Sequence, residues 1–286
     1  MSQSVTVEAP AKLNLFLRIL SREADGYHGI ETLFARIGLA DRLTAEAADP
    51  PGVTLTVDGP DLGPPVENLA VRAAEMVLGA LRPSFGVTLH LEKRIPVGAG
   101  LGGGSADAAA ALHAVNALGG NAVPRHELFQ MAARLGADVP FCLSGAPMAL
   151  GWGRGDRLFV LPAPPAAPLL LVSPPVAVRT AEAYGWVDQG RDATGRRGAL
   201  ALDLEALGSW GSIGRMSGND FEVPVFGRHS EIRAAYEAVA GTHPLICRMS
   251  GSGSTVFGLY RTTRDRDDAA MRLGKKYGKV IATETR

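Results

Sequence analysis

The residues with the clearest chemical potential lie in one glycine-rich stretch, PVGAGLGGGSADAAAAL (residues 96–112). Glycine adopts positive φ angles and lets a backbone approach a ligand without a Cβ clash. The alanines that follow favour a helix, and the first N–H groups of a helix have no partner within it, so they can bind an anion. A flexible turn is the alternative. So many glycines directly before a strong helix former favour a phosphate-binding loop.

The familiar phosphate loops do not fit this stretch. Gly98, Gly100 and Gly103 satisfy GxGxxG, but the dinucleotide fingerprint also has an acidic residue about 20 positions later. The corresponding stretch, LGGNAV (residues 118–123), contains no acid. No Lys-Ser or Lys-Thr follows the glycines as in a Walker A loop, and the chain has neither HRD nor DFG. A nicotinamide oxidoreductase is therefore disfavoured.

Phosphoryl transfer also needs a group that aligns or deprotonates the attacking hydroxyl. Asp138 follows Gly136 and precedes Pro140, which restricts its backbone, and a carboxylate there can accept a proton. An ordinary helix-terminal aspartate is equally compatible. Lys12 lies in an apolar strand, where a lysine is costly unless it is paired. A lysine at a strand edge that extends to solvent is otherwise the commoner case.

Residue patterns predict the elements that would position these groups. Two-residue alternation predicts strands over residues 5–7, 13–19 and 87–91, and DGYHG (residues 25–29) predicts a turn. Helical spacing predicts helices over residues 68–81, 105–118 and 124–135. In the second half we expect strands near residues 169–172, 245–249 and 255–260, the last two on either side of Gly251 to Gly253, and helices over residues 180–186, 200–207, 231–240 and 265–277.

Composition limits the class of protein. The 286 residues include 29 basic and 29 acidic ones, so a balanced charge gives no global footprint for nucleic acid or an anionic membrane. Cys142 and Cys247 are far apart without a CxxC, which predicts no disulfide framework, no zinc site and a reducing compartment. The first residues lack the pattern of a signal peptide. We expect a cytoplasmic protein that is a monomer or weak homodimer.

One apolar segment could be mistaken for a membrane span. Residues 158–178 (LFVLPAPPAAPLLLVSPPVAV) are long enough to cross a bilayer, but their six prolines would break a spanning helix repeatedly. We interpret the segment as a connection between domains that leads into a buried strand. This predicts domains over residues 1–155 and 156–286.

The motifs taken together resemble one known family. APAKLNLFL (residues 9–17), DGYH (25–28), the glycine loop, GADVPF (136–141), GNDFE (218–222) and MSGSGSTVF (249–257) are similar to motifs of the GHMP kinases. GLGGGS, APAKLNL and DGYH resemble the branch of that family that acts on a cytidine diphosphate methylerythritol. The resemblance runs almost from end to end.

This resemblance implies a fold and an activity. The implied fold is a two-domain α+β GHMP kinase, with an N-terminal domain like domain 2 of ribosomal protein S5, a C-terminal ferredoxin-like domain and the active site between them. The implied reaction transfers the γ-phosphate of ATP, with Mg²⁺, to a hydroxyl of the cytidine diphosphate methylerythritol in non-mevalonate isoprenoid precursor biosynthesis. Another small-molecule GHMP kinase, such as homoserine kinase, and a non-catalytic nucleotide-binding protein are the alternatives.

The resemblance also implies roles for individual residues. Lys12 and Asp138 match the catalytic pair. Tyr27 and His28 match the cytosine site, with Thr180 and Tyr184 closing it, and Asn14 matches a substrate contact; Tyr184 also fits an ordinary helix face. Asn68 and Lys93 match the adenosine site, although Asn68 also fits a helix N-cap. The implied nucleotide loop comprises Pro96, Val97, Gly98, Ala99, Gly100, Leu101, Gly102, Gly103, Gly104, Ser105 and Ala106.

Two further features leave roles open. Ser105-Ala106 stands where many relatives have Ser-Ser, so one hydroxyl is missing. Asp107 suits the helix dipole and could instead contact the metal. Residues 250–254 resemble a second glycine loop that closes near the phosphates, with a hairpin turn as the alternative. Mg²⁺ is implied by ATP chemistry rather than by a visible cluster of ligands.

Overall fold

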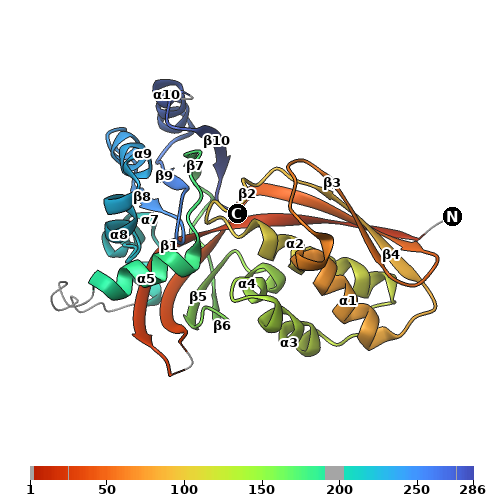
Figure 1. The fold of residues 1–286 in the computed structure, drawn as a ribbon. Helices are drawn as coiled ribbons and strands as arrows, with labels where there is room; N and C mark the ends of the chain where they lie inside the picture. Colours follow the sequence, from red (N-terminus) through yellow and green to blue (C-terminus); the bar gives the residue numbers. More distant parts are fainter. Residues whose placement is uncertain (1–2, 25, 191–202, 275) are drawn as a thin grey trace.

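The protein consists of two lobes, each built on its own sheet (Figure 1). The computed structural model describes residues 3–24, 26–190, 203–274 and 276–286. The long strands β1 and β2 extend across both lobes (Figure 1). One hydrophobic cluster joins them, because Leu13 and Leu15 of β1 pack with Leu169 and Phe257 of the second sheet.

The first sheet is mostly antiparallel. Its path runs β3-β4-β2-β5-β6, with β1 paired to β2 and only β3 and β4 parallel. The strands are β1 (Ser4–Arg22), β2 (His28–Ala48), β3 (Val53–Asp58), β4 (Gly86–Glu92), β5 (Met148–Gly153) and β6 (Arg157–Leu161).

Helices of the first lobe cover this sheet. They are η1 (Pro65–Glu67), α1 (Leu69–Leu81), α2 (Gly103–Leu118), α3 (Arg125–Leu135) and α4 (Val139–Ser144). In α1, Ala70, Ala73, Ala74 and Val77 lie on one face and are buried, while the side chain of Asn68 caps the helix by accepting the Ala70 N–H. Helix α2 is buried almost all round, because its run of alanines lets neighbouring elements approach closely.

The second sheet has the strand order β10-β7-β9-β8 and is antiparallel throughout. Its strands are β7 (Pro168–Ser173), β8 (Ile246–Met249), β9 (Val256–Leu259) and β10 (Lys279–Glu284). With helices before β8 and after β9, this order is the ferredoxin-like arrangement that the resemblance implies. The helices are α5 (Thr180–Gly190), α6 (Leu204–Leu207), α7 (Trp210–Met216), α8 (Glu222–Arg228), α9 (Ser230–Ala240) and α10 (Thr263–Leu273).

Most predicted elements are present with small changes of boundary. The predicted strands near residues 5–7 and 13–19 are parts of the single strand β1. The helix predicted over residues 265–277 is wrong at its end, because α10 stops at Leu273 and Gly274 adopts a positive φ of 51°. The helix predicted over residues 200–207 begins outside the described residues, and α6 forms its last turn.

Residues 158–178 contain no helix, and the next helix, α5, begins at Thr180. They contain most of β6 and all of β7, so the chain passes from the first sheet to the second between Leu161 and Pro168. The division into residues 1–155 and 156–286 stays a prediction. Within the described part of the chain, every helix is too short or too polar to cross a bilayer.

Candidate functional site

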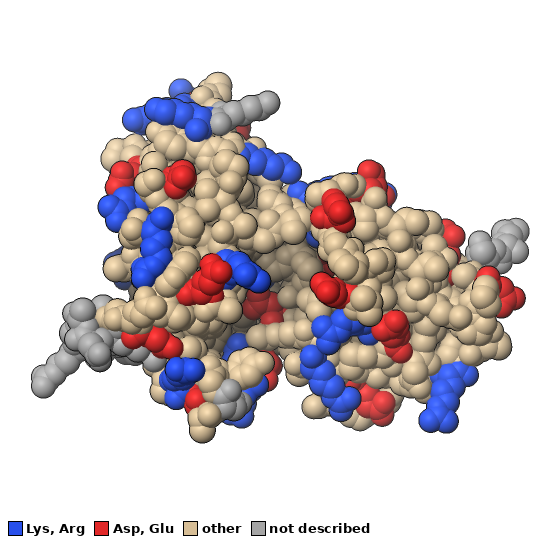
Figure 2. Space-filling model, viewed as in Figure 1, with Lys and Arg blue, Asp and Glu red and all other residues tan. Residues whose placement is uncertain are grey.

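A cleft of about 1300 Å³ lies between the two lobes. In the space-filling view the molecule is hollowed at this place (Figure 2). The first lobe contributes Lys12, the glycine loop and Asp138, and the second contributes α5 and residues 251–253. All the predicted acceptor-site residues line this cleft: Asn14, Tyr27, His28, Thr180 and Tyr184.

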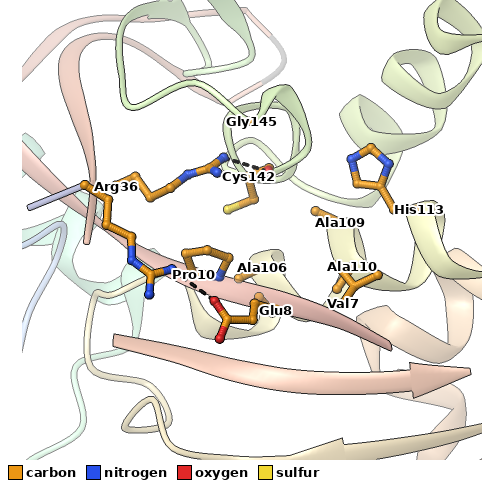
Figure 3. A pocket seen from close by; sticks show the side chains of 12 residues that line it. Val7, Glu8, Pro10, Arg36, Ala106, Ala109, Ala110, His113, Cys142 and Gly145 are labelled. Carbon is orange, nitrogen blue, oxygen red and sulfur yellow. Dashed lines mark hydrogen bonds and ion pairs between the residues drawn. The ribbon is translucent and has the colours of Figure 1, made fainter. Parts of the chain in front are cut away.

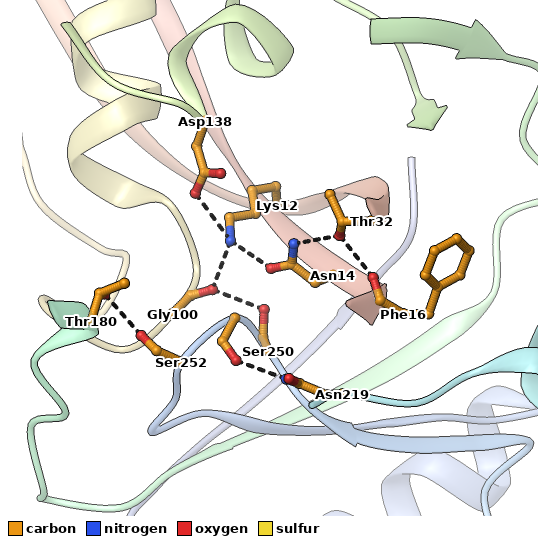
Figure 4. Close-up of polar contacts among 11 residues, drawn as sticks. Lys12, Asn14, Phe16, Thr32, Gly100, Asp138, Thr180, Asn219, Ser250 and Ser252 are labelled. Carbon is orange, nitrogen blue, oxygen red and sulfur yellow. Dashed lines mark hydrogen bonds and ion pairs between the residues drawn. The ribbon is translucent and has the colours of Figure 1, made fainter. Parts of the chain in front are cut away.

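Lys12 and Asp138 both line the cleft, and their charged groups point toward each other (Figure 4). The Nζ of Lys12 is 3.2 Å from Oδ2 of Asp138, and the lysine side chain is 4% exposed against 31% for the aspartate. Asp138 is the N-cap residue of α4, and Pro140 lies in the first turn of that helix. The buried Lys12 thus has the ionic partner that its position predicted, and the carboxylate of Asp138 is open to the cleft.

Two further acceptors hold the ammonium of Lys12. Nζ donates to Oδ1 of Asn14 at 2.7 Å and to the carbonyl of Gly100 at 3.2 Å. Asn14 in turn donates through Nδ2 to Oγ1 of Thr32, which donates to the Phe16 carbonyl. This chain of buried bonds fixes the lysine head group, and Thr32 is a member that the sequence did not reveal.

The glycine loop needs glycine because its backbone is packed against other parts of the site. Gly100 has a φ of +76°, and a Cβ there would lie 2.1 Å from the Ser250 carbonyl oxygen. Gly102 has a φ of +70°, and its Cβ would lie 2.9 Å from Cγ and Cε of Lys12. Gly102 is also the N-cap of α2, which leaves the first N–H groups of that helix for an anion. The same glycines thus join the catalytic lysine, the second loop and the helix terminus.

A smaller pocket of about 330 Å³ lies beside this loop. It is lined by Asn68, Lys93 and every residue from Pro96 to Ser105. Ala106, the remaining residue of the predicted nucleotide loop, does not line this pocket. It is 1% exposed and faces a different cavity, because one residue further along α2 turns the side chain by about 100°.

A cluster of buried charged side chains lies beside this pocket, and two of them, Lys93 and Asp107, line it. Lys93 pairs with Asp41 and with Oδ2 of Asp107, the latter at 2.8 Å. Asp41 is satisfied further by the N–H groups of Arg94 and Ile95, whereas Oδ1 of Asp107 is buried without a partner. Burial, opposed by Lys93 and reinforced by the charge of Asp41, raises the pKa of Asp107 to about 7. The contact that the structure shows for the Asp107 side chain, which is only 3% exposed, is thus with Lys93.

The far end of the cleft is aromatic. The rings of His28 and Tyr184 stack with centroids 4.7 Å apart, and Phe221 packs edge-on to Tyr184 at 4.9 Å. Nε2 of His28 is 2.8 Å from Oδ1 of Asp188 on α5, a residue that sequence reasoning missed. Burial, reinforced by the charge of Asp138, raises the pKa of Tyr184 to about 12, which keeps its hydroxyl neutral.

Tyr27 lies beside this group and is 58% exposed. The guanidinium carbon of Arg154 lies 3.8 Å from the centroid of its ring, as in a cation–π contact. Arg154 also lines the cleft. The acceptor end thus offers aromatic rings, an imidazole and a cation, a set suited to a planar base and an anionic group.

The second glycine loop connects β8 and β9, so it is a hairpin connection that also lines the cleft. Oγ of Ser250 donates to the Gly100 carbonyl at 2.8 Å, and Ser252 bonds to Thr180 at 2.9 Å. The GNDFE motif supports this loop. Asn219 donates to the carbonyls of Met249 and Gly251.

The acidic members of the same motif hold the neighbouring strands. The carboxylate of Asp220 accepts the Ile19 N–H of β1 at 2.7 Å, and that of Glu222 accepts the Met249 N–H at 2.9 Å. The Asp220 bond joins the second lobe to β1, the strand that bears Lys12, and the Glu222 bond holds β8 within the second lobe.

Comparisons with known proteins agree with this geometry. Residues 68–146 match the model of the GHMP kinases N terminal domain, and residues 202–279 match that of the GHMP kinases C terminal. A 4-diphosphocytidyl-2-C-methyl-D-erythritol kinase of Pelotomaculum thermopropionicum is 38% identical over 98% of both chains. The chain belongs to this kinase family. The enzyme of the same name from Solibacter usitatus is 41% identical over 89% of this chain and 81% of its own.

Solved structures place the chain in the same fold. A crystal structure of a 4-(cytidine 5'-diphospho)-2C-methyl-D-erythritol kinase superposes with a TM-score of 0.80 at 38% identity over 98% of both chains. Homoserine kinase from Cytophaga hutchinsonii reaches a TM-score of 0.72 at 20% identity, over 100% of this chain and 96% of its own. That second likeness concerns the fold alone.

Proposed function

We propose that this chain is an ATP-dependent kinase that phosphorylates a hydroxyl of 4-diphosphocytidyl-2-C-methyl-D-erythritol to give its 2-phosphate, a step in non-mevalonate isoprenoid precursor synthesis. The observation that carries the proposal is the position of the Lys12–Asp138 pair. It lies between a glycine-rich helix terminus and an aromatic acceptor site in one cleft.

ATP fits the residues beside the loop. The open N–H groups at the start of α2 would bind phosphate oxygens, and the glycine backbone leaves room that a Cβ would fill. Asn68 and Lys93 stand at the edge where adenosine would lie, but the side chain of Asn68 also caps α1 and the ammonium of Lys93 is paired. Lys93 would therefore shape the adenosine site more than it would donate to the base.

Mg²⁺ would supply charge neutralisation to the transferred phosphate. The described residues contain no group of three or more His, Cys, Asp or Glu that could hold a metal. This fits Mg²⁺, which commonly keeps several waters and binds through one or two protein ligands and substrate phosphates. Ser105, which is half-buried, would offer a hydroxyl within the nucleotide pocket, while Asp107 is buried against Lys93.

Asp138 would act as the general base. Its carboxylate faces the cleft and can accept the proton of the acceptor hydroxyl as that oxygen attacks phosphorus. Lys12 orients this carboxylate and places a fixed positive charge beside the reacting oxygens. Because Asn14 and Gly100 also hold its ammonium, the lysine needs no rearrangement during the reaction.

The aromatic end would bind the cytidine group. Tyr27 would stack on the cytosine ring, and His28, held by Asp188 and Tyr184, would hydrogen-bond its edge. Thr180, bonded to Ser252, would close the site from the second lobe. Arg154 and Arg22 line the same cleft and offer positive charge to the acceptor's diphosphate.

A coupled ADP-release assay tests this function. Wild-type protein with ATP and Mg²⁺ should release ADP with 4-diphosphocytidyl-2-C-methyl-D-erythritol and not with homoserine, and the Asp138→Asn variant should release almost none. ADP release with homoserine alone would replace the proposed acceptor by that of the other kinase. Release of no ADP with any alcohol would leave a nucleotide-binding protein.

A further inference from the structure

A third cavity lies apart from the cleft and the nucleotide pocket. It has a volume of about 290 Å³ and lies between β1, β2, α2 and α4 (Figure 3). Its wall on α2 consists of Ala106, Ala109, Ala110 and His113, a different face of the helix from that beside the nucleotide pocket. This volume is just below the usual range for ligand sites, about 300–1,000 Å³, and so suits a small ligand.

Arg36 gives this cavity its charge. It lies on β2 in register with Lys12, and its side chain extends towards α4, where Nη2 donates to the Cys142 carbonyl at 3.4 Å. That bond is long, and no ion pair joins Arg36 to a carboxylate in the described part of the chain. A guanidinium has five N–H donors, and among the described residues this is the one hydrogen bond of the Arg36 side chain, so donors remain for a ligand in the cavity that Arg36 lines.

Burial also makes this charge unfavourable as it stands. Desolvation lowers the pKa of Arg36, and the charge of Arg286 acts in the same direction. Arg286 lines the cavity too, with its guanidinium 3.0 Å from the carboxylate of Glu8. The side chains of Arg36, Glu8 and Arg286 together carry one net positive charge, which an anion would neutralise.

We propose that this cavity, the Arg36 pocket, binds a small oxyanion such as a phosphate or a carboxylate. The guanidinium fork of Arg36 matches such a group geometrically, and the alanines of α2 accommodate an apolar part of the ligand. This site is separate from the proposed nucleotide and acceptor sites and does not depend on the proposed function.

Occupancy would affect the two helices that carry the chemistry. Ala106 follows Ser105 of the nucleotide loop, and Cys142 belongs to α4, whose N-cap residue is Asp138. An anion bonded to Arg36 would contact both helices and so stabilise their packing against the first sheet.

Calorimetry with inorganic phosphate tests this inference in the full chain. A saturating non-hydrolysable ATP analogue would occupy the glycine loop first, and chloride at equal ionic strength would correct for salt. Arg36→Gln should weaken phosphate binding at least about tenfold, since it removes a charge-assisted bond. Arg42→Gln, a half-exposed arginine on the same strand outside the pocket, should bind like wild type.

Two further measurements keep the test decisive. Arg36→Lys retains the charge but loses the planar guanidinium fork, so its affinity for phosphate should fall several-fold. This variant provides the test if Arg36→Gln does not fold. Acetate, titrated in the same way, distinguishes the two sources of oxyanion, and saturable binding of either that requires Arg36 supports the site. Equal affinity in wild type and the Arg36 variants, or no saturable binding of either anion, would overturn it.

Discussion

Asp138 is held by one strong partner and by the first turn of a short helix. The Lys12 ammonium, 3.2 Å away, fixes the direction of the Asp138 carboxylate. The carboxylate is not enclosed, because 31% of the aspartate side chain stays exposed to solvent. The Asp138→Asn variant preserves this shape and removes the basic oxygen. We expect turnover to fall about 10²–10⁴-fold while both substrates still bind.

The measurement is single-turnover phosphoryl transfer at saturating substrates. Lys12→Met should also lose turnover, and the double variant should lose far less than the product of the two, because the lysine acts partly by positioning the aspartate. Near-normal turnover in Asp138→Asn would rule out the base. Full additivity would separate the role of Lys12 from that of Asp138.

His28 depends on a residue of the other lobe. Nε2 of His28 lies 2.8 Å from Oδ1 of Asp188, which leaves Nδ1 as the ring nitrogen that can bond to the acceptor. Asp188→Asn should raise the KM for the acceptor roughly three- to tenfold, because a neutral bond is weaker than a charge-assisted one by about 1 kcal/mol.

The KM for ATP should stay constant in the same variant. Glu182→Gln, an exposed change on the same helix α5, serves as the matched control and should alter neither KM. An unchanged KM for the acceptor would show that His28 is held by its stacking on Tyr184 alone.

At Gly102, where the glycine loop contacts Lys12, we expect any side chain to disturb ATP binding. Gly102→Val combines an unfavourable φ of +70° with a contact of 2.9 Å to the lysine chain. Equilibrium binding should show a large loss of ATP affinity. Gly120→Val is the matched control, because Gly120 has a φ of +71° with nothing within 4 Å and lies beyond the other end of α2.

The two variants separate backbone strain from the site itself. Both should lose some stability in thermal unfolding, but only Gly102→Val should lose ATP binding in the fraction that remains folded. If ATP bound equally to both variants, the loop would be a structural turn and not a nucleotide cradle.

Periodic apolar residues made several elements predictable, whereas the long strand β2 and the short helix α4 were missed. Alternation identified most of β1, and helical spacing identified α1, α2, α3 and α9. The long strand β2 escaped because most of its first half is buried without regard to side, so its sequence has no two-residue period. Helix α4 has six residues, too few to show a helical pattern.

The same limit applies to the candidate site. Local motifs and family resemblance indicated Lys12, His28 and Asp138, which the structure brings into one cleft. Asp188 and Asp41 were missed, because each acts through a residue far away in the sequence and has no motif of its own. Such partners become visible only when the fold places them together.

The two lobes form one structural unit around the cleft. Strand β1 carries Lys12 and Asn14 in the first sheet and contacts the GNDFE motif of the second lobe through Leu17 and Ile19. The two glycine loops meet where Ser250 bonds to the Gly100 carbonyl. Any movement that separated the lobes would therefore disturb the nucleotide loop and the catalytic lysine together.

Stability of the whole molecule should depend on pH through the charge cluster of Lys93, Asp41 and Asp107, which joins β2, α2 and the residue that follows β4. Because burial raises the pKa of Asp107 from 3.8 to about 7, the folded protein holds a proton that the unfolded chain has released. The stability from this group is complete below pH 3.8 and is lost as pH rises through about 7. Asp107→Asn keeps a neutral side chain at every pH and removes this dependence.

Chemical unfolding of wild type and Asp107→Asn between about pH 5 and pH 8 measures the effect. The difference in unfolding free energy between the two proteins should shift in favour of the variant as pH rises, because only wild type must ionise a buried acid. Asp268→Asn, an exposed change on α10, should give a curve parallel to wild type. Parallel curves for Asp107→Asn would mean that Lys93 keeps Asp107 ionised throughout, with both carboxylates charged around one ammonium.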